Sequence, residues 1–544
     1  MWFYVRQVLV PYQRADAATH NRPRGNLSDL YPRWLGAREL LLNHRDPYSP
    51  ELTREIQAGY YGRELDPDRP ADPRDQQGFV YPVYVVFLLG PLIHLPFLVV
   101  QAGFRCLLVV LTAASVLLWL RVLNWRPSAA TTAILIVLAL GSFPTVQGIE
   151  LQQLSLVVSG MIAGCAFLLA GNHLLLAGVV LAFATIKPQL VLPMVAWLIL
   201  WAFSDLRKRA GLLWGFSLTV AILLAGAQYV LPGWMGRFWG AVSAYRQYTD
   251  GAPSLLDVLI TPVWARILTT LIAFALVSVC WLARSEPANT TAFGVVSALV
   301  LAVTVVVIPT FGPYNQLLLL PGILSVISNR TILRNRSVLT RAACVIAAPV
   351  FFWPWLAALA LTVASFVLPG QSVKQAWVMP LWTILYVPFT VLLLLGLIVA
   401  TTEVSHGGKN IFKGLTLRRH RFQTMIFEEV ATSVLSFSYS IRDQNYAIAR
   451  MQIAAVAFVG GIRKQANREV AVSGPDYLVI ANQQWRDVPA VDIFQFAVAT
   501  DAGDDQGRVL LSNMFVREEA IGGSYDFGQR HAGCQLRIDH ALES

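Results

Sequence analysis

The chain has 544 residues, of which 56% are hydrophobic and only 14% are charged, and its mean hydropathy is +0.54. Soluble domains carry roughly 25% charged residues, so this composition excludes an ordinary soluble protein. The formal net charge is +10. The basic residues gather at the ends of apolar runs, as at 205–209 and 330–341, which is typical of cytoplasmic membrane anchoring. They do not cluster with aromatic residues on a soluble face, so we expect no nucleic-acid partner.

The first 12 residues are apolar but too short to span a bilayer, and Arg6 interrupts them. The polar segment that follows requires a preceding helix or a signal if it lies outside the membrane. Two explanations stay open: the natural start lies upstream, which we prefer, or residues 1–12 rest on the membrane surface.

Residues 14–78, called the first loop from here on, are predicted to be extracytoplasmic. Asp29 lies in this loop, two residues before Tyr31, and precedes a predicted helix at 30–42. A carboxylate beside an aromatic ring at a membrane surface is a plausible general base next to a sugar-stacking side chain. The alternative is that Asp29 caps the helix, because Asp is a favoured N-cap residue.

The apolar stretch 79–98 contains three prolines and a histidine. Each interior proline removes a hydrogen bond that lipid cannot replace, so we predict a juxtamembrane element here rather than a spanning helix. Apolar runs of near-spanning length then follow one another to residue 400. They are predicted at 102–123, 129–145, 151–170, 173–186, 188–203, 211–231, 265–283, 291–308, 314–328, 342–367 and 378–400.

The basic loops orient these helices. With Arg121, Arg126, 207–209, Arg284 and 330–341 in the cytoplasm, the segments 146–150, 187–188, 232–261 and 309–313 lie on the opposite side, together with the first loop. Polar residues that are distant in the sequence would therefore share one face. The sequence predicts an all-α polytopic membrane protein with an extracytoplasmic first loop.

Three of these outer segments carry candidate functional residues. Lys187 stands between two apolar runs, where a charge is either functional or snorkels to the interface. Glu150 and Gln153 belong to a polar cluster at a helix end, which is otherwise a simple interfacial terminus. Tyr314 and Asn315 follow a Pro- and Gly-containing turn that a plain helix–loop–helix connection does not explain.

The remaining residues point to no further site. Four of the five cysteines lie inside apolar runs and no pair has metal-ligand spacing, so we interpret them as small core residues. We expect no essential metal and no cofactor. Residues 1–404 are predicted to form the membrane domain. Residues 405–544 form a cytoplasmic tail that is a small domain, a disordered extension or sequence foreign to the membrane domain.

Several motifs in order carry a family resemblance. They are Asp29-Leu30-Tyr31, Asp46-Pro47-Tyr48, a Tyr-Pro stretch at 81–82, Gln153-Leu154-Ser155, Ala-Thr-Ile-Lys-Pro at 184–188, and Pro-x-x-x-x-Tyr-Asn at 309–315. Their order and spacing over residues 26–400 resemble glycosyltransferase family 87 of the GT-C superfamily. Two features depart from the family pattern: Gln152 stands where the family usually has Gly, and the first spanning helix is missing or truncated.

The resemblance implies a GT-C-like bundle of about 11–13 spanning helices in a bacterial-type plasma (inner) membrane. It also implies an inverting transfer of a hexose, most often mannose, from a polyprenyl-phosphate donor to a glycan or glycolipid on the extracytoplasmic face. The family's base maps to Asp29, and Lys187, Arg33 and Arg45 are candidates to bind the donor phosphate. The predicted substrate-binding residues are Tyr31, Asp46, Tyr48, Glu150, Gln153, Tyr314 and Asn315.

Two rival functions stay open. A transporter or lipid-carrier flippase would share the helices but would place polar groups near the bilayer midplane, often at broken helices. A non-catalytic scaffold would explain the helices but not the polar first loop.

Overall fold

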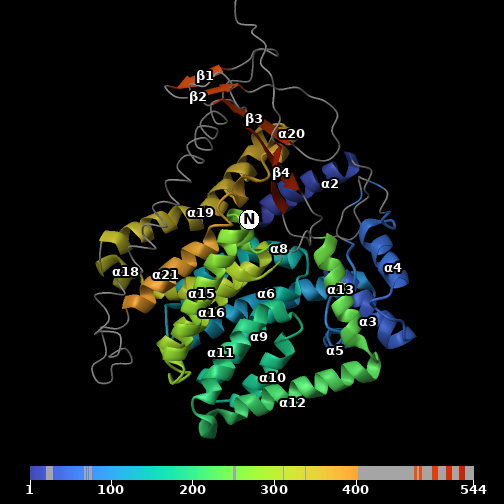
Figure 1. Cartoon of the computed structure of the whole chain (residues 1–544), viewed down its shortest axis with the longest axis vertical. Coiled ribbons are helices and arrows are strands. Elements are labelled where there is room, and N and C mark those ends of the chain that lie inside the picture. The colour runs from blue at the N-terminus through green and yellow to red at the C-terminus, as the bar shows by residue number, and fades with distance from the viewer. Residues whose placement is uncertain are drawn as a thin grey trace, which may run out of the picture. The chain divides into compact units, whose positions relative to one another are not determined.

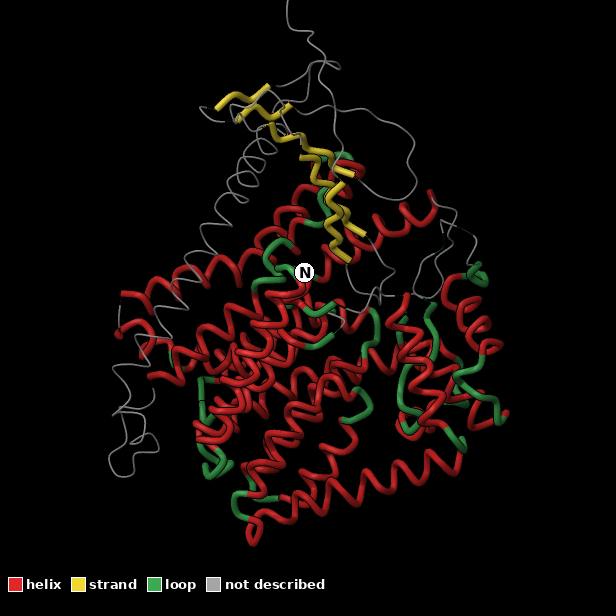
Figure 2. The backbone as a smooth tube through the Cα atoms, viewed as in Figure 1, coloured by secondary structure: helices red, strands yellow, loops and turns green. Residues whose placement is uncertain are grey.

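The computed structural model describes residues 1–401 apart from 20–27, 67, 68, 70, 71, 73–75, 249–252, 310, 311 and 337, and beyond residue 401 it describes five strands. Up to residue 401, every regular element in the described ranges is a helix (Figure 2), which confirms the helical fold class. The chain divides into two compact units, Met1–Thr402 with Arg517–Asp526, and Glu403–Val516 with Phe527–Ser544. The domain boundary after residue 404 stays a prediction.

Most of the longer helices of the first unit are labelled in Figure 1. In chain order the helices of this unit are α1 (Trp2–Tyr4), a π-helical turn η1 (Val5–Leu9), α2 (Val10–Thr19), α3 (Leu30–Asn43), α4 (Pro50–Tyr61), α5 (Val85–Leu89), η2 (Gly90–Leu92), α6 (Phe97–Val122), α7 (Ala129–Gly141), α8 (Phe143–Glu150), α9 (Leu154–Ala170), α10 (Leu174–Ala184), α11 (Pro188–Phe203), α12 (Leu206–Val230), α13 (Trp234–Tyr248), α14 (Leu255–Leu259), α15 (Pro262–Ala283), α16 (Thr291–Val307), η3 (Pro313–Leu319), α17 (Leu320–Ser328), α18 (Arg330–Arg336), α19 (Val338–Val367), α20 (Gly370–Gln375), η4 (Met379–Leu381) and α21 (Val387–Thr401).

The second unit contains a sheet of five strands in the order β1-β2-β3-β4-β5. They are β1 (Ala471–Gly474), β2 (Tyr477–Ile480), β3 (Ile493–Ala499), β4 (Leu510–Arg517) and β5 (Asp526–Ala532). The pairs β1–β2, β2–β3 and β3–β4 are antiparallel. The sequence analysis left three interpretations of residues 405–544 open. Apart from these five strands, those residues lie outside the described part of the chain, so the three interpretations stay predictions.

Four helices of the described part are long and apolar enough to cross a bilayer: Phe97–Val122, Leu206–Val230, Pro262–Ala283 and Thr340–Val367. A fifth span is possible if α7 and α8, which meet at a bend of 56°, count as one. Each of the eleven predicted spans contains a helix, but six of those helices have only 10–17 residues and α17 has nine. At 1.5 Å per residue, helices of that length fall short of a bilayer core of about 30 Å. The protein is a polytopic helical membrane protein in which many apolar helices are short or broken.

The N-terminal helical stretch packs inside the unit. Tyr4, Val8 and Leu9 are buried in one hydrophobic cluster with Phe143 of α8 and Trp377 after α20. These side chains bury apolar area against other helices, and the place of residues 1–12 relative to a membrane stays a prediction.

The proline-containing stretch 79–98 does not form a single helix. It contains the short helices α5 and η2, and α6 begins only after Pro96. This confirms that the stretch is not one spanning helix, because its prolines interrupt the backbone hydrogen bonds that lipid requires.

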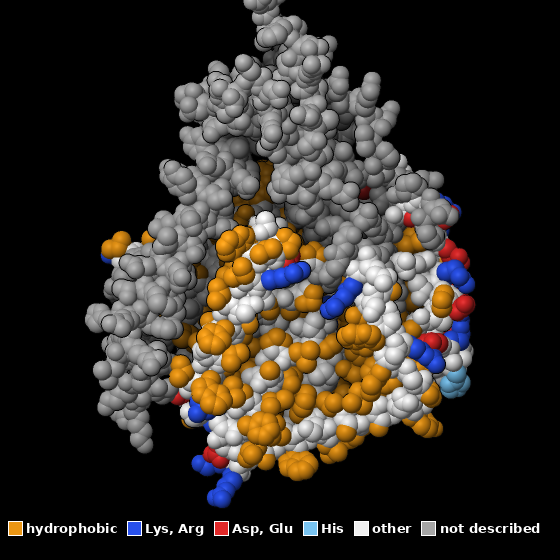
Figure 3. All heavy atoms as spheres, viewed as in Figure 1, with side chains coloured by type: hydrophobic (Ala, Val, Ile, Leu, Met, Phe, Trp, Pro, Cys, Tyr) orange, Lys and Arg blue, Asp and Glu red, His pale blue; other side chains and the backbone are white. Residues whose placement is uncertain are grey.

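The surface of the helical unit matches a lipid environment. Large apolar side chains lie exposed along α12 and α15, among them Trp214, Leu218, Trp264 and Phe274. The face shown in Figure 3 is correspondingly rich in hydrophobic side chains. Exposed apolar area of this extent is costly in water and is expected where lipid is the solvent.

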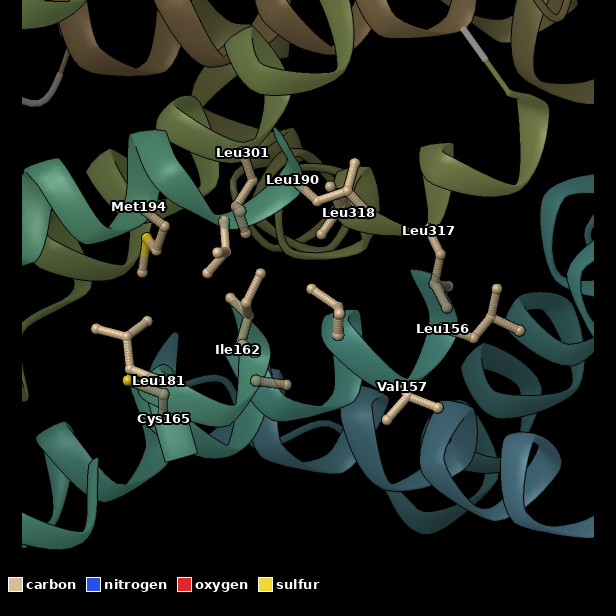
Figure 4. Packing of buried hydrophobic residues seen from close by; sticks show 14 of the residues in the cluster. Leu156, Val157, Ile162, Cys165, Leu181, Leu190, Met194, Leu301, Leu317 and Leu318 are labelled. Carbon is tan, nitrogen blue, oxygen red and sulfur yellow. The ribbon is translucent and has the colours of Figure 1, made fainter. Parts of the chain in front are cut away.

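Two kinds of packing hold the bundle together. In the interior, leucine, valine and isoleucine side chains from α9, α10, α11, α16 and η3 interdigitate (Figure 4). Between α10 and α12 the backbones touch, since a Cβ on Gly215 would lie 2.1 Å from the Leu175 carbonyl oxygen, and one on Gly178 would lie 2.3 Å from that of Leu212. Gly211 and Gly215 are four residues apart in α12, the spacing that lets membrane helices approach closely.

Candidate active site

Asp29 occupies the N-cap position of α3, but its carboxylate does not cap the helix. The backbone N–H of Asp29 donates to the carbonyl of Leu151, 2.9 Å away, so the first loop is tied to the α8–α9 connection. Asp29 is only 5% exposed, and its carboxylate accepts hydrogen bonds from Gln153 Nε2 and, at 3.4 Å, from the Tyr60 hydroxyl. The capping alternative is therefore wrong for the side chain, which faces other segments of the chain.

A hydrogen-bonded network continues from Gln153 into the bundle. The amide oxygen of Gln153 accepts from Lys187 Nζ at 3.4 Å, and Lys187 Nζ also donates to Ser155 Oγ at 2.6 Å. Ser155 Oγ in turn donates to Asn315 Oδ1 at 2.8 Å. Residues 29, 153, 155, 187 and 315 therefore form one connected set, called the polar network from here on, although the sequence separates its ends by nearly 300 residues.

Helix breaks place the members of the network. Gln152 has φ +51°, a left-handed conformation that separates α8 from α9 and brings Gln153 to the N-terminus of α9. The Gln152 side chain supports this turn by donating to the Ile149 carbonyl at 2.8 Å and accepting from Gln101 at 3.0 Å. Glycine would adopt such a φ without steric cost, whereas Gln152 is held in it by these side-chain hydrogen bonds. Lys187 precedes Pro188, which begins α11.

Lys187 is the unusual charge of the site. Its side chain is buried, its Nζ lies 5.1 Å from the centroid of the Tyr314 ring, and its hydrogen-bond acceptors are the neutral oxygens of Gln153 and Ser155. Within the part of the chain that the structure describes, no carboxylate oxygen lies within 4.0 Å of Nζ. A buried ammonium without a direct anionic partner is costly, so this position favours an anionic ligand. A side chain that snorkels reaches the membrane interface and is exposed there, so the snorkelling alternative does not fit the buried Lys187.

The amide of Gln153 connects the two charges of the network. Its NH₂ group faces the Asp29 carboxylate and its oxygen faces the Lys187 ammonium. The opposite orientation would place the amide oxygen against the carboxylate and the NH₂ against the ammonium, so the charges themselves select the orientation. Gln153 therefore separates Asp29 from Lys187 while holding both.

Arg33 and Tyr31 lie beside Asp29 on α3. Arg33 Nη1 donates to the Asp29 carbonyl at 2.6 Å, and its guanidinium stacks over the Tyr81 ring at 4.7 Å. The Tyr31 ring packs against Trp34 and Phe97. Arg33 is thus close to the base candidate, whereas Tyr31 serves mainly to pack α3.

Arg45 and Asp46 of the first loop form ion pairs apart from the polar network, and these ion pairs are called the outer network from here on. Arg45 forms ion pairs with Glu39 at 3.0 Å and with Glu55, and its hydrogen bonds hold the pKa of Glu55 below the usual value. Asp46 pairs with Arg237 of α13 at 2.8 Å. Two carboxylates already hold Arg45, so the structure does not bring it together with Lys187 as a phosphate ligand.

Tyr48 joins this outer network to the neighbourhood of Arg33. Its hydroxyl donates to the carbonyl of Tyr81 at 2.6 Å, and its backbone N–H donates to Asp46 Oδ1 at 2.9 Å. Burial raises the pKa of the Tyr48 hydroxyl, which therefore stays protonated and keeps donating.

Glu150 lies at the end of α8 and contacts two arginines that the sequence analysis did not select. Arg6 of η1 reaches one of its oxygens at 3.2 Å and Arg105 of α6 reaches the other at 3.3 Å. Tyr60, which donates to Asp29, was also missed. Arg105 had a usable signal, because it is a charge inside an apolar run, whereas Tyr60 had none.

The donor set does not suggest a metal centre. Among the described residues, no three His, Cys, Asp or Glu side chains gather closely enough to hold a metal ion. The charged groups that meet here are one carboxylate and one ammonium, which suits proton transfer and binding of an anion.

These features define a class: a polytopic helical membrane protein with a buried acid–amide–ammonium network at the breaks between its helices. Residues 79–309 match the model of glycosyltransferase family 87. The chain therefore contains a membrane glycosyltransferase domain of this family, which confirms the resemblance over that range. No significant match was found among curated proteins or among solved structures. The matched range contains Glu150, Gln153 and Lys187, and the structure joins Asp29 and Asn315 to it by hydrogen bonds.

Proposed function

We propose that this glycosyltransferase uses a polyprenyl-phosphate hexose, mannose in the first instance, and transfers the sugar to a glycan or glycolipid on the extracytoplasmic face of a bacterial-type plasma membrane. The observation that carries the proposal is the polar network, in which one buried amide holds a carboxylate and an ammonium. A general base and a fixed cation are the two groups that displacement of a phosphate from a sugar needs.

In the proposed reaction, the acceptor hydroxyl oxygen attacks the anomeric carbon while the bond from that carbon to the phosphate oxygen breaks. The hydroxyl proton passes to the Asp29 carboxylate, and the bonding electron pair leaves with the polyprenyl phosphate. Attack from the face opposite the leaving group inverts the anomeric configuration. Lys187 stabilises the negative charge that develops on the leaving phosphate.

Burial supports these roles. Asp29 and Lys187 are 5% and 7% exposed, and an electrostatic interaction is stronger in such surroundings than in water. Gln153 is a positioning residue in this scheme, because it keeps the base and the cation from forming a direct ion pair that would neutralise both.

The direct test uses the full chain in liposomes with a labelled polyprenyl-phosphate mannose and a lipid extract as acceptor. A new glycosidic bond in the product, with the anomeric configuration opposite to that of the donor, is the expected result. Movement of unreacted donor between leaflets without a new bond would instead indicate a flippase and contradict the proposal. A reaction with another hexose donor alone would correct only the sugar.

A further inference from the structure

A second charged cluster lies next to the polar network. Arg6 and Arg105 come from different helices and share the carboxylate of Glu150, with N–O distances of 3.2 and 3.3 Å. The chain continues from Glu150 to Leu151, whose carbonyl accepts the backbone N–H of Asp29. This cluster, called the arginine pair from here on, therefore adjoins the proposed base but belongs to other side chains.

The charges of the arginine pair are not balanced. Two guanidinium groups face one carboxylate, which leaves one positive charge, whereas the single Arg45 has two carboxylates. The Arg6 and Arg105 side chains remain 63% and 40% exposed, so part of each guanidinium is open to a ligand. Among the described residues, the buried Nε of Arg105 has no hydrogen-bond partner. A desolvated donor without an acceptor is costly, so the Arg105 side chain would gain from a shift that brings this Nε to an anion.

The position of Arg105 along α6 indicates the kind of anion. Arg105 lies eight residues after Phe97, where α6 begins, or about 12 Å along the helix axis. Helical side chains slant toward the N-terminus, so the guanidinium reaches back toward that end of α6 and toward the headgroup region. Gln101, one turn nearer that end, donates to Gln152 and adds a polar surface there.

We propose that the arginine pair binds the singly charged phosphodiester of a lipid headgroup. One phosphodiester neutralises the remaining positive charge, and guanidinium groups suit phosphate oxygens because they donate parallel hydrogen bonds. Basic pockets between membrane helices bind lipid headgroups by the same physics. The site is separate from Lys187 and does not depend on the proposed transfer reaction.

The test measures binding to the full, delipidated chain in neutral detergent, without any sugar donor. The probes are dihexanoyl phosphatidylglycerol and inorganic phosphate at equal ionic strength, and the readout is the shift in melting temperature over a titration. We expect saturable stabilisation by the phosphatidylglycerol. Arg105→Gln and Arg6→Gln should each weaken it about tenfold, the value of one charge-assisted hydrogen bond.

Two further variants separate binding from folding. Glu150→Gln keeps both arginines and removes the competing carboxylate, so it should tighten phosphatidylglycerol binding several-fold. Arg207→Gln removes one exposed positive charge in the first turn of α12 and should leave binding unchanged. Unaltered binding in the arginine variants, or weaker binding in Glu150→Gln, would overturn the proposal. Equal affinity for inorganic phosphate would overturn its assignment to a lipid. Because the assay contains no sugar donor, its outcome for lipid binding does not depend on whether the chain transfers mannose.

Discussion

Replacing Asp29 by Asn tests the proposed base most directly. The substitution keeps the size of the side chain, but an amide cannot accept a proton near neutral pH. A positioned general base contributes about 10²- to 10⁴-fold to a rate, so turnover with a polyprenyl-phosphate donor should fall by that factor.

The structure limits the accompanying loss of stability. The Asp29 side chain makes no cap hydrogen bond to α3, and Asn is about as good an N-cap residue as Asp. Asn can turn its oxygen toward Gln153 Nε2 and its NH₂ toward the Tyr60 hydroxyl, so both contacts persist without charge assistance. The cost should be about 1 kcal/mol, the difference between a charged and a neutral hydrogen bond.

The assay compares initial rates in liposomes and melting temperatures in detergent. The matched control is Asp205→Asn, because Asp205 does cap its helix, α12, through a hydrogen bond from the Lys208 backbone N–H. That control should keep its activity and nearly all of its stability, because Asn accepts the cap hydrogen bond about as well as Asp. Asp29→Asn with a rate within a few-fold of the unmodified protein would refute the reasoning, and Asp46 would become the next candidate.

The remaining predictions concern the cation, the helix break, the packing and the topology. Lys187→Met should lower the transfer rate by orders of magnitude with normal insertion, and Lys187→Arg should retain part of it; an unchanged rate in Lys187→Met would rule out a role for its charge. Gln152→Gly should fold at least as well as the unmodified protein because glycine accepts the left-handed φ, whereas Gln152→Ala should lower the melting temperature since it keeps the strain and loses the side-chain hydrogen bonds; the reverse order would contradict this account. Gly215→Val should abolish stable purification, because its Cβ would lie 2.1 Å from a carbonyl oxygen of α10, and normal thermal stability would disprove that contact. In a cysteine-free background, an impermeant thiol reagent added to intact cells should label cysteines placed in the first loop but not at Arg207, and protection of the loop would reverse the predicted orientation.

Much of the candidate site could be anticipated from the sequence because its members are polar or charged residues in otherwise apolar segments. Lys187 is a charge between apolar runs, and Gln153 and Asn315 interrupt hydrophobic segments. The basic loops then predicted one common face for residues that are distant in the chain. The hydrogen bonds from Asp29 through Gln153, Lys187 and Ser155 to Asn315 bring these distant residues together.

The sequence could not separate residues that look alike. Arg33 and Arg45 were equivalent candidates to bind phosphate, yet Arg45 is held by Glu39 and Glu55 while Arg33 lies beside Asp29. Asp29 fitted a helix cap as well as it fitted a base. Which role each residue takes depends on the side chains that approach it from other segments of the chain. The local sequence does not specify those contacts.

By itself, the sequence determined the membrane environment and the positions of the helices, because burial in lipid demands long apolar runs and satisfied backbone hydrogen bonds. Only the tertiary structure decided how the N-terminal helix packs and which charges meet. Arg6 and Arg105 reach Glu150 across intervals of 144 and 45 residues, as their numbers in the chain show. Contacts over such intervals arise from the packing of whole helices, which periodicity and composition do not specify.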